Sequence, residues 1–394
     1  MLPTCDPLNA FLDLPSVPVT SAPSGPLSGM QLAVKDIYDV AGYPTGCGNS
    51  SKARVADPVT LTAPAIQQLL DAGATFIGKT QTDELAFSLI GHNAHYPQPV
   101  NPAAPDRVTG GSSSGSAAAV AGALADIGTG SDTGGSIRAP ASFCGLVGLR
   151  TTHGAISLKG TMPLAPSLDT FGWFAKDMLC YRKVAEVLLT GTAFQTWRPM
   201  RLSGLEALLL GDADRHEYQR LERIVAKALG DPVVLAPLSH DLEDLYWCFR
   251  RIQSHEAWSV HGEWIGDQDR NLGPGVKERF EYGATISNET VAEETVRRKD
   301  FTAELTARLG NDGILVMPTV PGAAPLRSLS FGDTQAYRER ALHLLCLSGL
   351  AGLPQLTLPL GTVNGAPFGI SLLGPKNSDL TLLDLGTRIM ASAH

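Results

Sequence analysis

Two segments rich in glycine and serine mark the first half of this chain. Residues 110–116 read Gly-Gly-Ser-Ser-Ser-Gly-Ser, and residues 130–138 read Gly-Ser-Asp-Thr-Gly-Gly-Ser-Ile-Arg. An alanine-rich stretch separates them. Glycine adopts backbone conformations that other residues avoid and lets a substrate approach closely, so each segment is predicted to be a loop that presents a serine hydroxyl. The pattern indicates nucleophilic catalysis by serine.

Short apolar runs alternate with helical patterns on both sides of these loops. Residues 32–35 and 74–78 are predicted strands, and residues 62–72 are a predicted helix with its apolar residues on one face. Residues 116–124 and 127–130 predict a further helix and strand. This alternation predicts an α/β fold in which helices cover both faces of a central β-sheet.

The second half of the chain first turns helical and charged, and then returns to strand patterns. No linker or internal repeat is visible, so residues 1–394 are predicted to form one domain. An extended, proline-rich segment at residues 1–28 and a largely helical insertion at about residues 215–310 belong to it. The predicted elements are helices at 220–229, 290–309 and 379–390 and strands at 314–317, 356–358 and 368–373.

Composition excludes several function classes. The chain has 394 residues and a formal net charge of −8, with no basic patch that would suit a nucleic-acid partner. It shows no export signal and no apolar run long enough for a membrane helix, so we expect a cytoplasmic protein without a membrane partner. The six cysteines are scattered without metal-ligand spacing, so we expect no metal and no other cofactor. The sequence is compatible with a homodimer.

Glycine-rich loops also bind phosphates, so this alternative has to be weighed. Neither segment contains the Gly-x-x-x-x-Gly-Lys-Ser/Thr string of a phosphate-binding loop. The dinucleotide fingerprint begins to fit at Gly128 and Gly130, but threonine occupies its third glycine position at Thr133. Nucleotide binding is therefore a minor alternative.

A serine-hydrolase elbow, Gly-x-Ser-x-Gly, fits residues 111–115 with Ser113 at its centre. Such an elbow follows a buried strand, whereas residues 102–109 contain two prolines and two charges. The elbow is therefore a lesser alternative.

A serine nucleophile that has no histidine partner needs another base. Lys35 follows the apolar residues 32–34, and burial would lower its pKa toward neutrality. Spacing alone favours a surface lysine at a strand end.

The two segments, taken with their surroundings, resemble the amidase signature family. The resemblance runs without gaps through residues 110–121 and 130–145, and shorter strings at residues 34–36, 78–86 and 148–150 also fit. It implies a large mixed β-sheet and amide hydrolysis by a Ser-Ser-Lys triad. Ser136 would be the nucleophile, Ser112 a bridging serine that follows a cis peptide bond, and Lys35 the base.

The same loops supply candidates for supporting roles. Glycines at 134 and 135 leave backbone N–H groups free to face the oxyanion that develops in the transition state. The predicted donors are the N–H groups of Thr133, Gly134, Gly135 and Ser136. Asp132, Arg138 and Ser113 are predicted to support the loops, with contact to an acidic substrate as a lesser alternative for Arg138.

Further strings resemble the plant-type indole-3-acetamide amidohydrolases, notably residues 91–96, 169–175 and 316–322. The partner expected from this resemblance is a small primary arylacetamide, hydrolysed to the acid and ammonia. Phe143, Trp173 and Trp258 are candidates for an aromatic pocket, although each also suits core packing. An amidase for aryl acylamides or small aliphatic amides, a non-catalytic signature protein, and a glutaminase-type subunit of an amidotransferase complex are the alternatives.

Overall fold

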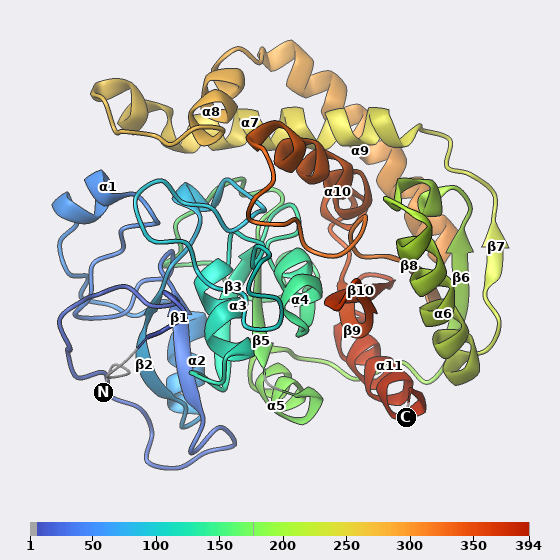
Figure 1. Ribbon diagram of the computed structural model, residues 1–394, viewed down its shortest axis with the longest axis horizontal. Coiled ribbons are helices and arrows are strands. Elements are labelled where there is room, and N and C mark those ends of the chain that lie inside the picture. The colour runs from blue at the N-terminus through green and yellow to red at the C-terminus, as the bar shows by residue number, and fades with distance from the viewer. Residues whose placement is uncertain (1–5, 176, 394) are drawn as a thin grey trace.

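The computed structural model describes residues 6–175 and 177–393, and its centre is one ten-stranded β-sheet (Figure 1). The strand order is β2-β1-β3-β5-β4-β9-β10-β8-β6-β7. Pairing is parallel at the two ends of the sheet and antiparallel from β3 to β8, so the sheet is mixed. The strands are β1 (Gln31–Lys35), β2 (Thr75–Thr80), β3 (Ile127–Asp132), β4 (Val147–Arg150), β5 (Thr170–Ala175), β6 (Arg198–Leu202), β7 (Val233–Leu235), β8 (Gly313–Pro318), β9 (Gln355–Val363) and β10 (Ala366–Leu373).

Helices cover both faces of this sheet, which confirms the predicted α/β class. The helices are α1 (Ser50–Val55), α2 (Pro64–Asp71), α3 (Ser114–Ala121), α4 (Arg138–Cys144), α5 (Met178–Leu188), α6 (Asp212–Leu229), α7 (Leu242–Asp267), α8 (Val276–Ala284), α9 (Asn288–Leu309), α10 (Phe331–Ala351) and α11 (Asp379–Ser392), with short 3-10 helices at Glu84–Ala86 and Leu205–Leu208. In the described residues, no helix combines the length and apolar character needed to cross a membrane.

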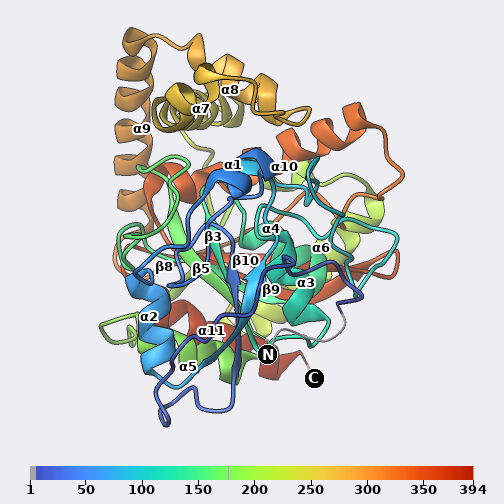
Figure 2. The same ribbon diagram turned by 90° about the vertical axis from the view of Figure 1, so that its left-hand side faces the viewer.

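The alternation of side chains along β9 separates the two helical layers. Leu356 and Leu358 lie against Gly386 of α11, whereas Thr357 lies on the face of Ser142 in α4. Helix α3 packs on α4, and α2, α5 and α11 form a row on the other side of the sheet (Figure 2). Two apolar helical layers thus enclose the sheet, and the strands at its centre are buried on both faces.

Helices α7, α8 and α9 lie together outside these layers, in yellow and orange at the top of Figure 1. Helix α10 contacts both α7 and α9 and so joins this group to the body of the protein. The short edge strand β7 lies between α6 and α7, in a region whose sequence predicts helix. Residues 6–28 contain no helix, and Phe11 forms an isolated bridge to Thr80 of β2.

Most element boundaries lie within a few residues of those predicted. The largest differences are at α6, which begins at Asp212 where residues 220–229 are the predicted range, and at β9, which continues to Val363 beyond the predicted residues 356–358. Near the glycine-rich loops, α3 begins at Ser114 and ends at Ala121 where residues 116–124 are the predicted range.

Candidate active site

Lys35 ends β1, and the sheet places it against both glycine-rich segments. Strand β1 pairs with β2 on one side and with β3 on the other, and the Lys35 side chain is fully buried. Its Nζ lies 2.8 Å from Ser112 Oγ, 3.0 Å from Ser113 Oγ and 2.9 Å from Ser131 Oγ. Hydroxyls both donate and accept hydrogen bonds, so this cluster can hold either protonation state of the amine.

Burial lowers the pKa of Lys35 from its ordinary value to about 7, although the charges of Asp83, Asp169 and Asp132 oppose this shift. A substantial fraction of the side chain is therefore uncharged near neutral pH. An uncharged amine inside a cluster of hydroxyls can accept a proton, which an ordinary surface lysine cannot do at this pH. The alternative of a surface lysine at a strand end is wrong.

Ser112 begins the turn that leads into α3, and the peptide bond between Gly111 and Ser112 is cis. The carbonyl oxygen of Ser112 accepts hydrogen bonds from the Asp83 N–H and the Thr82 hydroxyl. Gly111 has no room for a side chain, because a Cβ atom there would lie 2.1 Å from Asp83 Oδ2. These contacts hold Ser112 Oγ toward Lys35.

Ser136 lies in the turn between β3 and α4. The turn requires glycine at position 135, where φ is +120° and a Cβ atom would lie 2.5 Å from Leu345. Ser136 is almost fully buried and lines a narrow cavity, and its hydroxyl makes no hydrogen bond within the described part of the chain, to Ser112 or to any other residue. The Ser136 hydroxyl is thus available to a ligand in that cavity.

The backbone N–H groups around Ser136 differ from the predicted set of oxyanion donors. The Gly135 N–H is not free, because it donates to Asp132 Oδ1 at 2.9 Å. The N–H groups of Thr133, Gly134 and Ser136 donate to no acceptor among residues 6–175 and 177–393. Three of the four predicted donors therefore stay available for an oxyanion.

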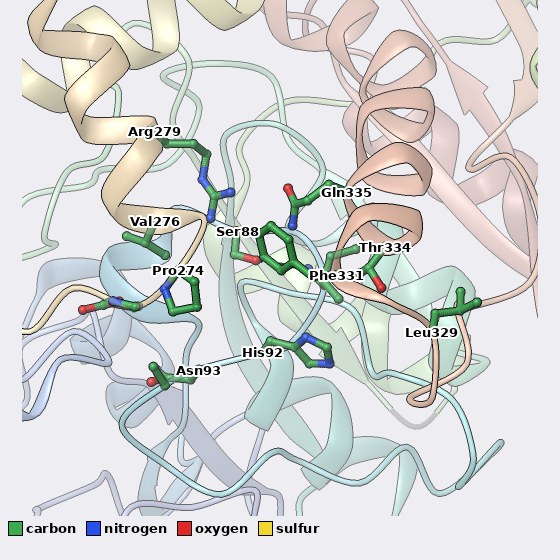
Figure 3. Close-up of a pocket in the computed structure, with 14 residues that line it drawn as sticks. Ser88, His92, Asn93, Pro274, Val276, Arg279, Leu329, Phe331, Thr334 and Gln335 are labelled. Carbon is green, nitrogen blue, oxygen red and sulfur yellow. Dashed lines mark hydrogen bonds between the residues drawn. The ribbon is translucent and has the colours of Figure 1, made fainter.

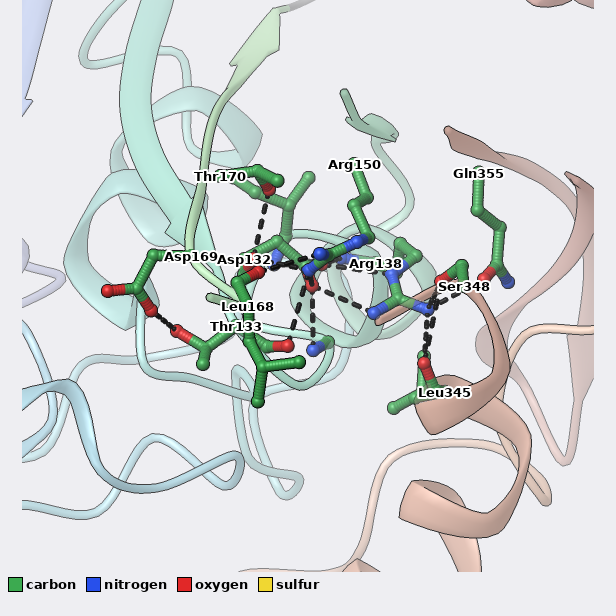
Figure 4. Close-up of polar contacts among 12 residues, drawn as sticks. Asp132, Thr133, Arg138, Arg150, Leu168, Asp169, Thr170, Leu345, Ser348 and Gln355 are labelled. Atoms are coloured by element: carbon green, nitrogen blue, oxygen red, sulfur yellow. Dashed lines mark hydrogen bonds and ion pairs between the residues drawn. The ribbon is translucent and has the colours of Figure 1, made fainter. Parts of the chain in front are cut away.

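Asp132 organises this turn through a buried ionic network (Figure 4). Its carboxylate accepts from Arg138 Nη2 at 2.8 Å and from Arg150 Nη1 at 3.1 Å. Burial alone would raise the pKa of Asp132, but the two guanidinium groups overcome this effect and hold the pKa below its ordinary value. Arg138 also donates to Ser348 and Gln355, so other residues of the chain already bind its guanidinium group.

Replacing Asp132 by asparagine is expected to lower the free energy of unfolding by about 3 to 5 kcal/mol, because Arg138 and Arg150 would stay buried without their anion. Urea unfolding followed by circular dichroism measures the change. Lys277→Gln is a matched control, since Lys277 pairs with Glu281 on the exposed surface of α8 and is expected to contribute less than about 1 kcal/mol. A loss below about 1 kcal/mol for Asp132→Asn would contradict the network's role.

Two neighbouring cavities meet at this turn. The serine cavity, as we call it, is lined by Ser136, Gly134, Gln253 and Arg338 among others, and at about 10 Å³ it has room for one water molecule. The apolar cavity beside it measures about 180 Å³. Its lining consists of Ile37, Ala86, Ser131, Thr133, Leu158, Thr161, Met162, Pro163, Leu164, Pro166 and Asp169.

The three aromatic residues predicted for a substrate pocket lie elsewhere. Trp173 is fully buried and stacks on Tyr181 at 4.8 Å between ring centroids, and Phe143 packs edge-on against Tyr337. Trp258 packs with the residues around α8. None of the three is among the described residues that line the serine or the apolar cavity. Their packing supports the alternative of core residues.

Several residues at the site escape sequence reasoning. Asp169 accepts a hydrogen bond of 2.6 Å from the Thr133 hydroxyl, and burial raises the pKa of this carboxyl to about 6. Ser131 supplies the third hydroxyl at Lys35, a contact that the loop sequence does not predict. Arg338 and Gln253 come from α10 and α7 and carry no motif that could have marked them.

Comparisons with known proteins agree with this architecture. A family model described as Amidase matches residues 14–199. Amidase 1 of Oryza sativa subsp. japonica is 37% identical over 95% of this chain and 93% of its own length, and Amidase 1 of Arabidopsis thaliana is 37% identical over 97% and 98%. A crystal structure of an amidase superposes with a TM-score of 0.84 and 30% identity, covering 93% of this chain and 85% of that one.

Similarity of this extent spans both glycine-rich loops, the central sheet and the outer helices. The names of the two relatives and of the solved structure all describe an amidase. The chain belongs to the amidase signature family and is an amide-hydrolysing enzyme.

Proposed function

We propose that this enzyme hydrolyses a small primary arylacetamide, such as indole-3-acetamide, to the carboxylic acid and ammonia. Ser136 acts as the nucleophile, Ser112 relays the proton and Lys35 is the base. The observation that carries the proposal is the buried Lys35 amine, 2.8 Å from the Ser112 hydroxyl and with a pKa of about 7. Buried lysines whose pKa is lowered toward neutrality are concentrated at functional sites, which favours a catalytic over a non-catalytic protein.

The reaction begins when uncharged Lys35 takes a proton from Ser112, which in turn takes the proton of Ser136. The Ser136 oxygen attacks the amide carbonyl carbon, and the oxyanion faces the free N–H groups of Thr133, Gly134 and Ser136. Each such donor is typically worth about 3 to 4 kcal/mol in the transition state. The same proton chain run backwards protonates the leaving nitrogen, and water then hydrolyses the acyl-enzyme.

In apo enzymes the hydrogen bonds of a catalytic chain are often open and close only when substrate binds. The missing contact between Ser112 Oγ and Ser136 Oγ fits this behaviour. The serine cavity also has to widen for an amide group, which requires side-chain movements of the kind that commonly accompany ligand binding.

The apolar cavity supports an arylacetyl group as the acyl part. Ile37, Met162 and Leu164 provide apolar surface, and the cavity borders the serine cavity at Ala86 and Thr133. An aromatic ring would bury its apolar surface there, and an indole N–H could pair with the Thr161 hydroxyl, which has no hydrogen-bond partner among the described residues.

The proposal is tested by measuring ammonia release from indole-3-acetamide, phenylacetamide and butyramide. The arylacetamides are expected to have the higher kcat/KM, because only they fill the apolar cavity. Met162→Trp should remove this preference by occupying the cavity. A higher kcat/KM for butyramide than for both arylacetamides would favour the alternative of a small aliphatic amidase.

The pH dependence follows from the pKa of Lys35. Because the base must be uncharged, kcat/KM is expected to rise with pH through about 7 and to level off in mildly alkaline solution. Amide substrates do not titrate in this range, so the profile reports the enzyme. A rate that is flat between about pH 6 and 9, with chemistry rate-limiting, would contradict the assignment of Lys35 as the base.

A further inference from the structure

Two arginine side chains lie buried beside the serine cavity without a hydrogen-bonded or ion-paired partner among the described residues. Arg338 of α10 is 5% exposed and lines the serine cavity, while Arg279 of α8 is 7% exposed and lines the next cavity. The Nε atoms of both are buried and have no hydrogen-bond partner within residues 6–175 and 177–393. The buried Arg138 and Arg150, in contrast, both bond to Asp132. Among the described residues, Arg338 and Arg279 therefore lack the carboxylate partner that Arg138 and Arg150 have.

No carboxylate nearby pairs with either arginine in the described structure. Asp83 is close enough to influence both arginines, and its Oδ2 accepts the Gly91 N–H while its Oδ1 has no hydrogen-bond partner among the described residues, yet it forms no ion pair with them. Glu278 also influences Arg279, but it accepts the Gly275 N–H. Glu84 accepts three hydrogen bonds from other residues, and Glu339 pairs with Arg250. Burial lowers the pKa of both arginines, which reflects the unfavourable free energy of a desolvated and unpaired cation.

The most favourable partner for a buried guanidinium is a carboxylate, which it binds through two parallel charged hydrogen bonds. Arg279 also lies over the ring of Phe87, at 5.4 Å from its centroid, which fixes its position but does not use its N–H donors. Two guanidinium groups on adjoining cavities, close enough to influence each other and unpaired among the described residues, therefore indicate an anionic group on the ligand.

The cavities lie in a fixed order along the segment that follows Asp83. Ala86 lines both the apolar and the serine cavity, and Ser88 lines both the serine cavity and a third one of about 350 Å³. This third cavity, here the arginine cavity, is drawn in Figure 3, where Arg279 and Gln335 point toward the space beside Ser88. Ser136 thus lies between an apolar side and a side that carries the two arginines, where Glu84, already hydrogen-bonded to other residues, also lines the arginine cavity.

From this order we infer a further activity, the hydrolysis of N-arylacetyl amino acids, with the acyl group in the apolar cavity and the amino-acid carboxylate bound by Arg338 and Arg279. The inference rests on amide hydrolysis at Ser136. The Ser136 oxygen bonds to the carbonyl carbon and the C–N bond breaks. The nitrogen takes the relayed proton and leaves as the free amino acid, and water hydrolyses the remaining ester to the arylacetate.

The test compares phenylacetylglycine with phenylacetylglycinamide, which share every group except the carboxylate. In the wild-type enzyme kcat/KM is expected to be at least about 30-fold higher for phenylacetylglycine, the size expected of charged hydrogen bonds. Arg338→Gln and Arg279→Gln should each reduce this ratio to below about 5-fold, and Arg338→Lys should retain part of it. Both conjugates are assayed with the same enzyme preparation, so the ratio of their kcat/KM values does not depend on the fraction of enzyme that is folded. Partial misfolding therefore does not mimic the result.

Arg340→Gln is the matched control, because Arg340 also belongs to α10 but donates to backbone carbonyls of the 3-10 helix at Leu205–Leu208. It should leave the ratio at its wild-type value. Equal kcat/KM for the two conjugates, or a wild-type ratio in both Arg→Gln variants, would overturn the inference.

Two further outcomes separate this inference from the proposed function. If phenylacetamide is hydrolysed but phenylacetylglycine is not preferred to its neutral analogue, the inference fails and the proposed function stands. If neither the primary amides nor the conjugates are hydrolysed, the proposed function itself fails. A third outcome is that succinamate is preferred to butyramide while phenylacetylglycine is not preferred to phenylacetylglycinamide. The arginines would then bind a carboxylate on the acyl part of the substrate, and the assignment to the amino-acid carboxylate would be overturned.

Discussion

Ser136→Ala is expected to lower kcat/KM for indole-3-acetamide by at least about 10⁴-fold, because the variant has no oxygen that can form the acyl-enzyme. Ser136 lies in the turn between β3 and α4 and lines the serine cavity, and its hydroxyl has no hydrogen-bond partner in the described structure, so its loss should change chemistry and leave the fold intact. Ammonia release measures the rate, and a thermal melt checks stability.

Ser113→Ala is the informative control for this variant. Ser113 also contacts Lys35, at 3.0 Å, and it is the central serine of the alternative elbow. Its loss is expected to be at least about 100-fold less damaging than that of Ser136, because Ser112 and Ser131 still surround the amine. The opposite ranking of the two variants would favour the elbow.

Lys35→Met is expected to lower kcat by about 10² to 10⁴-fold, the usual contribution of a general base. Methionine fills a similar volume without a titratable group, so the site stays packed while the proton acceptor is lost. The residual rate should no longer rise through pH 7. Lys35→Arg should also be impaired, because a guanidinium keeps its proton at every accessible pH.

Combining Lys35→Met with Ser136→Ala is expected to add almost nothing to the loss caused by Ser136→Ala alone. Residues that act as one unit give non-additive effects, because the base has no role once the nucleophile is gone. Lys159→Met, on the exposed surface, controls for the loss of a positive charge and should keep wild-type activity. Fully multiplicative losses in the double variant would contradict a single proton chain.

The sequence carries enough information for the parts of the site that are local in the chain. Residues 110–116 and 130–138 are contiguous, and the chemistry of their glycine and serine residues is visible without a fold. Lys35 is also predictable as a candidate, but its burial is not, since burial depends on β1 lying between β2 and β3. The same sheet pairing brings Ser131 to Lys35.

The cavities could not be predicted because they are built from distant segments. Arg338 and Gln253 reach Ser136 from helices more than a hundred residues further along the chain, and helical patterns do not indicate which loop a helix covers. Aromatic identity misleads for a related reason. Trp173 and Phe143 suit a pocket by composition, yet β5 is buried on both faces of the sheet and α4 is buried along its length, so both side chains lie in the core.

The measurement that bears most directly on the proposed mechanism is covalent labelling with a fluorophosphonate, which reacts with an activated serine. Peptide mapping by mass spectrometry then identifies the labelled residue. We expect one label per chain, on Ser136, with a labelling rate that rises through about pH 7 and falls sharply in Lys35→Met. A label on Ser113 or Ser112, or a rate on Ser136 that is unaffected by the loss of Lys35, would contradict the mechanism.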